Sequence, residues 1–304
     1  MPSKFLTDKQ LARHDIETLK RFVRHHLGGY RVMLKDLPPG QPVYRGVEWK
    51  DRPTLVGDLG APPQEKVKLW GRAHRPGRPM FYASVGPPAC FYEIKSQPDT
   101  HVALSEWVVT KPFWMHNLGY HAQALQRLGV TELGMRAMLA YPLENESKEN
   151  IRTRLRLSLS FTDEIEDGEQ WNYRYKRSVA VFELLFDRAE PLSLLPGGVT
   201  IPRAGGTVYP AMRLMGMADN LAIFPEFVIE ALALRRVLWI KVEKVDLVRR
   251  AYSLLTEAQA TDFSGGKIAW EEVAGEMADR RNTFFYEGEH WKVQPGKAGT
   301  FFRP

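Results

Sequence analysis

The chain has 304 residues, of which 44% are hydrophobic and 26% are charged, and its formal net charge is +6 at pH 7. These proportions exclude an intrinsically disordered chain, which would carry fewer apolar residues and a more one-sided charge. The single cysteine, Cys90, excludes a small module held together by disulfide bonds. The chain is long enough for one large domain or two smaller ones.

The sequence has no run of about 18 apolar residues, and its first residues lack the hydrophobic core of a signal peptide. We therefore expect a cytoplasmic protein without a membrane-spanning segment, in a compartment where a lone thiol stays reduced. The basic balance permits an anionic partner such as a nucleotide, an acidic protein or nucleic acid. An excess of six positive charges is modest for this length, so nucleic acid is not the favoured partner.

The first 40 residues are expected to form a helical segment added to the main domain. A helix is predicted over residues 7–27, because Thr7 can cap its start and Gln10 can reach back to complete a capping box. Gly28-Gly29 would end this helix, and residues 35–40 have the composition of a linker or turn. The apolar face of the helix would consist of Leu11, Leu19, Phe22, Val23 and Leu27.

The main domain is expected to span residues 41–250, with residues 251–304 as a C-terminal segment. The residue pattern in the first half of this domain predicts strands and helices, with a loop rich in proline, glycine and aspartate at residues 51–66. The expected elements are a strand at 42–46, a strand at 79–84, a helix at 89–95 begun by Pro87-Pro88, a strand at 102–109 and a helix from Asn117 to Leu128.

Residues 151–161 alternate between apolar and polar side chains, a pattern that predicts a half-buried strand. Its polar side carries Arg152, Arg154 and Arg156, which would form a solvated face or, as the alternative, an anion-binding stripe. The later elements are expected to be a helix at 173–188, a strand at 237–242, a helix at 269–280 and a wrapping tail at 282–304. Because the strands and helices do not alternate regularly, we expect an α+β fold and not a doubly wound sheet.

Several common signatures of chemistry are absent from the sequence. It has no phosphate-binding loop, no dinucleotide glycine fingerprint and no Gly-x-Ser-x-Gly elbow. The histidines do not have the spacing of metal ligands on one helix face, so we predict no metal site. Cys90 has no base nearby in the sequence and is interpreted as a buried structural thiol.

One stretch of the chain combines arginine, glycine, tyrosine and glutamate in a characteristic order. It contains Arg45 in Val-Tyr-Arg-Gly, Arg72 in Gly-Arg, Gly77, Tyr82 in Phe-Tyr-Ala-Ser, and Glu93 in Ala-Cys-Phe-Tyr-Glu. This order resembles the RES domain family, which is named for an arginine, a glutamate and a serine. The resemblance covers roughly residues 41–250.

A second block supports the resemblance more weakly. Residues 206–211 read Gly-Thr-Val-Tyr-Pro-Ala, and residues 219–225 read Asp-Asn-Leu-Ala-Ile-Phe-Pro. The family places a serine where this chain has Ala211, and a methyl group cannot form a hydrogen bond. Activity could therefore be reduced, altered or supplied by another hydroxyl, for which Ser84 and Thr207 are candidates.

The resemblance implies an ADP-ribosyltransferase-like α+β fold that binds and consumes NAD as a substrate. Family members act as bacterial toxins, each paired with a protein antitoxin that blocks the pocket. They break the nicotinamide–ribose bond and pass ADP-ribose to water, phosphate or a macromolecule. The resemblance thus implies an NAD glycohydrolase or phosphorylase that needs no metal.

The chemistry of the residues agrees with this implication. Breaking the nicotinamide–ribose bond builds positive charge on the ribose, and a carboxylate such as Glu93 stabilises that charge. The guanidinium groups of Arg45 and Arg72 suit the diphosphate, because arginine pairs bidentately with phosphate oxygens. An aromatic face attracts the cationic nicotinamide ring, for which Tyr82 and then Tyr209 are candidates. The catalytic candidates are therefore Glu93, Arg45 and Tyr82.

Two alternatives stay open from the sequence. The chain could be an ADP-ribosyltransferase that modifies a protein or nucleic acid, which the arginine-rich residues 72–78 would favour. It could also be a non-catalytic protein that binds NAD or nucleic acid and has lost activity through Ala211. Homo-oligomerisation and the role of the terminal segments 1–40 and 251–304 are likewise open.

Overall fold

Residue contacts divide the computed structural model into two units, each built from three stretches of the chain. Unit 1 comprises Met1–Pro38, Pro62–Phe81 and Pro112–Phe227, and unit 2 comprises Pro39–Ala61, Tyr82–Lys111 and Val228–Pro304. These units do not follow the expected segments 1–40, 41–250 and 251–304. The structure describes residues 5–27, 34–127, 129, 147–163, 165, 168–186, 204–214, 218–246, 248, 251–276, 280–287 and 290–295.

Unit 1 begins with two short helices, α1 (Asp8–Arg13) and α2 (Ile16–Arg24), where the sequence predicts one helix. The capping box is confirmed, because the Thr7 hydroxyl accepts from the Gln10 N–H and the Gln10 side chain accepts from the Thr7 N–H. The single helix is wrong because His14 is extended and the Asp15 side chain caps a new helix. Phe22, at 39% exposure, does not share the buried face of the other four apolar residues.

The first half of the expected linker at 35–40 is instead part of a strand, β1 (Leu34–Leu37), which pairs antiparallel with β5 (Phe113–Asn117), and the second half contains the predicted turn. Its pairing ties the N-terminal segment to residues almost 80 positions later, so a boundary at residue 40 does not separate this segment from the fold. The strand ends before Pro38-Pro39, which cannot donate hydrogen bonds to a ladder.

The sheet of unit 1 runs in the order β1-β5-β6-β7, with β6 (Gly206–Pro210) and β7 (Asp219–Ile223). The β5–β6 pair is parallel and the other two pairs are antiparallel, so this sheet is mixed. Asn117 ends β5 and caps no helix, which corrects that prediction; the helix that follows is α4 (Ala122–Arg127). Gly206 has φ +154°, and a Cβ there would overlap the Ala222 carbonyl of β7.

The predicted strand at 151–161 is wrong, because these residues form the helix α6 (Lys148–Phe161), capped by Ser147. The alternation is misleading because α6 is buried on several sides and its small polar residues, including Ser158, are buried too. Arg154 is only 3% exposed whereas Arg152 is exposed, so the three arginines form no common stripe.

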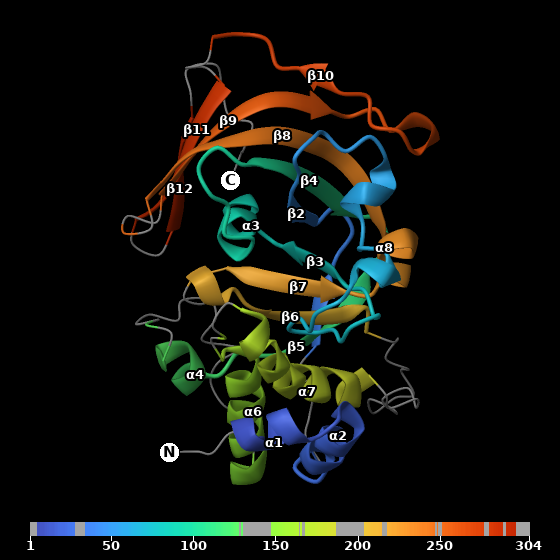
Figure 1. Ribbon diagram of the computed structural model, residues 1–304, viewed down its shortest axis with the longest axis vertical. Coiled ribbons are helices and arrows are strands. Elements are labelled where there is room, and N and C mark those ends of the chain that lie inside the picture. Colours follow the sequence, from blue (N-terminus) through green and yellow to red (C-terminus); the bar gives the residue numbers. More distant parts are fainter. Residues whose placement is uncertain are drawn as a thin grey trace. The chain divides into compact units, whose positions relative to one another are not determined.

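Helix α7 (Lys176–Phe186) follows a 3₁₀ helix at Glu169–Tyr175, in place of the single helix expected from residue 173. Val179, Phe182 and Leu185 are buried. The ring of Phe186 stacks on His116 of β5, and Phe161 of α6 contacts Tyr209 of β6. Helices α6 and α7 thus cover the sheet of unit 1 (Figure 1). Residues 187–188 lie outside the described residues.

The sheet of unit 2 is antiparallel and runs in the order β3-β2-β4-β8-β9-β11-β12, with β10 paired to β9. The strands expected at 42–46, 79–84, 102–109 and 237–242 are confirmed, as is the helix expected at 89–95. The elements are β2 (Pro42–Glu48), β3 (Phe81–Ser84), α3 (Pro87–Glu93), β4 (His101–Val109), α8 (Pro225–Ala231), β8 (Leu232–Asp246), β9 (Ala251–Ala260), β10 (Glu271–Glu272), β11 (Arg281–Glu287) and β12 (His290–Pro295).

The C-terminal segment contributes strands to this sheet. The helix expected at 269–280 is wrong over residues 269–276, which contain the short strand β10 and no helix; residues 277–279 lie outside the described residues, and Arg280 is helical. The described part of the expected wrapping tail forms the β11–β12 pair, whereas residues 288–289 and 296–304 lie outside the described residues. Strand β9 pairs with β8 from Val237 to Asp246 (Figure 1). A domain boundary at residue 250 would therefore separate the paired strands β8 and β9. The protein is of the α+β class, as expected, and no helix among the described residues is long and apolar enough to cross a membrane.

Burial of His116 should make unit 1 sensitive to acid. Burial lowers the pKa of His116 to about 4, whereas an unfolded histidine has a pKa of about 6.5. Between these values the unfolded chain binds more protons, so the free energy of unfolding decreases as the pH falls from about 6.5 to about 4. We expect the melting temperature to fall over this interval and His116→Phe to weaken that dependence. His25→Phe, at an exposed position, is the control.

Candidate functional site

Three of the predicted site residues, Arg45, Tyr82 and Glu93, belong to unit 2 and lie on neighbouring elements. Arg45 is in β2, Tyr82 is in β3, and Glu93 is the last residue of α3. The Arg45 guanidinium donates a hydrogen bond to the Tyr82 carbonyl, with Nη1 and O 2.9 Å apart. The Arg45 carbonyl accepts from the Ser105 hydroxyl of β4 at 3.1 Å. The arginine is therefore fixed between two neighbouring strands.

Gly46 allows α3 to pack directly against β2. A Cβ at this position would lie 3.0 Å from the Cβ of Cys90 and 3.6 Å from the Cδ1 of Ile94, which caps α3. The Cys90 thiol lies 3.4 Å from the Tyr44 carbonyl, to which it donates. The motif Tyr-Arg-Gly thus supplies the arginine and the space beside it that the helix needs to bring Glu93 close.

The charges of Arg45 and Glu93 both act on the thiol between β2 and α3. Burial raises the pKa of Cys90 to about 12, Arg45 lowers it and Glu93 raises it further. Cys90 therefore stays protonated at neutral pH, which agrees with the interpretation of a structural thiol. Burial lowers the pKa of Arg45 to about 10, so its guanidinium remains charged at neutral pH.

Phe81 and Tyr82 are consecutive residues of β3, so their side chains point to opposite faces of the sheet. We therefore expect one of the two side chains to serve only as a core residue. Phe81 is completely buried, whereas the Tyr82 side chain is half-buried and partly accessible. The tyrosine is therefore the one of the pair that can offer a ring face to a ligand. Glu93 is half-buried as well, with its Oε1 atom buried.

Arg72 belongs to unit 1, where its guanidinium binds the C-terminal end of α6. Its Nη1 atom donates to the Phe161 carbonyl at 2.6 Å and to the Asp163 carbonyl at 3.3 Å. The guanidinium also lies 5.6 Å from the ring centre of Tyr175. These contacts give Arg72 a structural function, because the last carbonyls of a helix need donors.

Tyr209 and Ala211 also belong to unit 1. Tyr209 is buried in β6 against Phe161, and the Ala211 N–H donates to the Ala218 carbonyl at 2.8 Å. Of the hydroxyls that could replace the family serine, Thr207 is fully buried and donates to the His116 carbonyl at 2.9 Å. Ser84, in β3 of unit 2, is buried at a position opposite Tyr44.

Glu106 of β4 is a buried carboxylate in the same sheet and is not among the predicted site residues. It forms ion pairs with Arg236 at 2.7 Å and Arg235 at 3.3 Å. Burial and the Glu106 charge raise the pKa of Tyr44, which lies opposite it on β2. A glutamate within the apolar run Val-Ala-Leu-Ser-Glu-Trp-Val-Val was the signal for a buried ion pair.

Among the described residues, no group of three histidine, cysteine, aspartate or glutamate side chains could hold a metal ion. The site of unit 2 is thus a cationic guanidinium, a carboxylate and an accessible aromatic ring on three adjoining elements. Such a set can bind an anion, pack on a ring and stabilise a developing cation. Comparison of the chain with protein-family models, with curated proteins and with solved structures finds no match.

The close approach at Gly46 gives a direct stability test. We expect Gly46→Ala to lower the free energy of unfolding by about 1–3 kcal/mol, because the added methyl overpacks the β2–α3 contact. Gly57→Ala is the matched control, since no atom lies within 4 Å of a Cβ at that position. Urea unfolding of both variants checks this, and equal stability of the two would contradict the packing described for α3.

Proposed function

We propose that this protein degrades NAD by breaking the bond between nicotinamide and ribose. The observation that carries the proposal is the grouping of Arg45, Tyr82 and Glu93 in unit 2. These are the catalytic candidates that the resemblance to the RES domain family implies. A fold of the ADP-ribosyltransferase type, within the α+β class, is part of the same proposal.

In this proposal Glu93 stabilises the ribosyl cation. Departure of neutral nicotinamide leaves positive charge on the ribose carbon, as in glycoside hydrolysis. A carboxylate held in a half-buried position interacts with that charge more strongly than it would in water. The α3–β2 packing at Gly46 holds the helix that carries this carboxylate.

Arg45 and Tyr82 have binding functions in the proposal. A guanidinium that stays charged at neutral pH suits the diphosphate, and its bond to the Tyr82 carbonyl sets its orientation. The accessible ring of Tyr82 would pack on the cationic nicotinamide ring. Arg72 and Tyr209 have structural contacts within unit 1, so the proposal does not depend on them.

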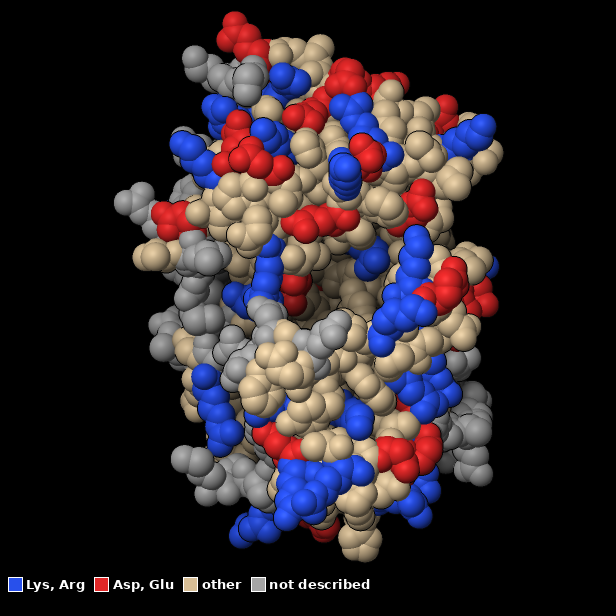
Figure 2. Space-filling view, viewed as in Figure 1, with Lys and Arg blue, Asp and Glu red and all other residues tan. Residues whose placement is uncertain are grey.

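A toxin neutralised by a protein antitoxin is the biological context that the resemblance implies, and it belongs to the proposal. Nucleic acid is the less favoured partner. On the face shown in Figure 2, basic and acidic side chains are interspersed, and an extended surface of one sign is what phosphate-backbone binding usually needs.

Product analysis tests the proposal and identifies the acceptor. The purified chain is incubated with NAD, with and without inorganic phosphate, and free nicotinamide is quantified. Nicotinamide with ADP-ribose would identify a glycohydrolase, and nicotinamide with phosphorylated ADP-ribose a phosphorylase. Label from NAD on a protein or nucleic acid would identify the transferase alternative. Absence of nicotinamide from a folded sample would contradict NAD cleavage.

A further inference from the structure

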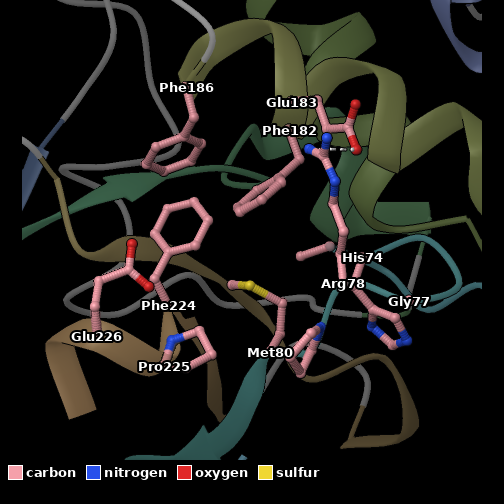
Figure 3. A pocket seen from close by; sticks show the side chains of 12 residues that line it. His74, Gly77, Arg78, Met80, Phe182, Glu183, Phe186, Phe224, Pro225 and Glu226 are labelled. Atoms are coloured by element: carbon pink, nitrogen blue, oxygen red, sulfur yellow. Dashed lines mark ion pairs between the residues drawn. The ribbon is translucent and has the colours of Figure 1, made fainter. Parts of the chain in front are cut away.

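A cavity outside the proposed NAD site lies entirely within unit 1 and was not anticipated from the sequence. It has a volume of about 370 Å³ and lies between the segment 73–80, the end of α7 and the start of α8 (Figure 3). This volume is at the lower end of the range for small-molecule sites and is large enough for one or two fused rings. Nothing in the proposed NAD chemistry uses this cavity.

Three phenylalanine rings form a continuous aromatic wall in this cavity. The ring centres of Phe182 and Phe186 are 4.6 Å apart, and those of Phe186 and Phe224 are 4.9 Å apart. Because the rings touch one another, a ligand cannot enter between them and must lie against the wall. Met80 faces the same space, and its flexible thioether can adapt to a flat ring (Figure 3). This side of the cavity suits a planar apolar body.

The polar end of the cavity is formed by Arg78 and Glu183 (Figure 3). Glu183 is only 7% exposed, and its carboxylate forms ion pairs with Arg75 at 3.0 Å, Arg78 at 3.6 Å and Lys20 at 3.6 Å. Within the described part of the chain, neither carboxylate oxygen accepts a hydrogen bond. A buried acceptor without a hydrogen bond is costly, so this carboxylate is suited to a donor from a ligand.

Arg78 offers the complementary group. Its side chain is 59% exposed, and within the described residues its guanidinium has one ion pair, the 3.6 Å contact with Glu183. A guanidinium has five N–H donors in a planar fork, so donors remain for a ligand oxygen. A carboxylate acceptor and a guanidinium donor therefore lie side by side at the polar end.

We propose that this cavity binds a neutral planar ring that carries an amide group. The ring would pack on the wall of Phe182, Phe186 and Phe224, the amide oxygen would accept from Arg78, and the amide N–H would donate to Glu183. A neutral group is favoured because three carboxylates already balance the three cations: Glu183, Glu17, which pairs with Lys20 and Arg75, and Glu226, which also lines the cavity. An added anion would have to lie beside the buried carboxylate. Burial lowers the pKa of His74, which also lines the cavity, to about 4, so it adds no charge at neutral pH.

Three probes of equal size separate the possible charge preferences. Benzamide, benzoate and benzamidine share one ring and differ only in the neutral, anionic or cationic group attached to it. The readout is the NMR signal of the Met80 methyl group in protein labelled at the methionine methyl carbons, assigned through Met80→Leu. We expect benzamide to shift this signal with a dissociation constant on the order of 1 mM. We expect at least about 10-fold weaker binding of the other two probes.

Two variants test the contacts, and one controls for changed charge. Arg78→Gln should weaken benzamide binding by about 10-fold, because it removes a charge-assisted donor at an exposed position. Phe186→Ala should weaken binding by removing part of the wall. Arg24→Gln, an exposed position on α2 outside the cavity, should leave binding unchanged.

The outcomes separate this proposal from NAD cleavage. A Met80 shift with benzamide that persists in Glu93→Gln supports the cavity, whether or not nicotinamide is released from NAD. Strongest binding of benzoate or benzamidine, or no Met80 shift with any probe at 10 mM (about ten times the expected dissociation constant), would overturn it. An unchanged affinity in Arg78→Gln would overturn the assignment of the polar end.

Discussion

Glu93→Gln is expected to reduce the rate of nicotinamide release by about 10²–10³-fold, the usual effect of removing one group that stabilises transition-state charge. Glutamine has the same shape as glutamate but no charge, so the packing of α3 on Gly46 should persist. The ground state already carries the nicotinamide cation, and the charge moves to the ribose only as the bond breaks. We therefore expect kcat to fall far more than NAD affinity, as measured by steady-state kinetics and calorimetric titration.

Glu48→Gln is the control for Glu93→Gln. Glu48 is an exposed carboxylate at the end of β2, the strand that carries Arg45. The same chemical change at this position should leave the rate nearly unchanged, because Glu48 is outside the proposed site and a surface substitution usually alters stability by no more than about 0.5 kcal/mol. Retention of full activity by Glu93→Gln would remove Glu93 from the mechanism, even if the wild-type chain degrades NAD.

Arg177→Met is expected to lower the free energy of unfolding by about 2–3 kcal/mol, the usual cost of removing a charged donor from its acceptors, because the carboxylate partners Asp8 and Asp163 are partly exposed. Arg177 of α7 is only 2% exposed. Its guanidinium donates to Asp8 at 2.7 Å and to the Leu6 carbonyl at 3.2 Å, and it pairs with Asp163. Methionine fills a similar volume, so the loss would come from the hydrogen bonds and ion pairs that Arg177 makes, while Asp8 keeps its ion pair with Arg174.

Chemical denaturation followed by far-ultraviolet circular dichroism measures this change. Arg24→Met is the control, because Arg24 is exposed at the end of α2. A change below about 1 kcal/mol for Arg177→Met would show that its partners find other donors or water. In that case the interactions of Arg177 would not be what holds α1 to α7.

The sequence predicts best those features that depend on short-range chemistry. The Thr7–Gln10 capping box, the proline start of α3 and the strands β2, β3, β4 and β8 follow from local residue types, whereas the later strands of unit 2 are not predicted. The grouping of Arg45, Tyr82 and Glu93 depends on a motif order, together with a glycine whose purpose is evident only in the structure. Once α3 packs on β2, a Cβ at Gly46 would come within 3.0 Å of the Cβ of Cys90.

The sequence predicts poorly those elements whose burial differs from the usual pattern. The alternation at 151–161 indicates a strand only if one side faces water, and α6 is buried on several sides. Residues 35–40 have the composition of a turn, but β1 is held by pairing with distant β5. The segments of each unit are interleaved along the chain, so no composition change marks the unit boundaries.

The cavity of unit 1 could not be predicted from the sequence either. Phe182 and Phe186 are predictable as apolar residues of a helix, but their contact with Phe224 depends on the packing of α7 beside the end of β7. Glu183 lies between two buried residues of α7, and its three cations come from α2 and the segment 73–80. Only the structure brings these groups together.

The most direct test of the account is the release of nicotinamide from NAD by the purified, folded full chain. Proton NMR of the reaction mixture follows the nicotinamide resonances over time and identifies the ribose product in the same sample. If the protein cleaves NAD as proposed, we expect one nicotinamide to appear for each NAD that disappears. We expect this activity to be lost in Glu93→Gln but not in Glu48→Gln. Stable NAD in the presence of the folded wild-type chain would contradict it.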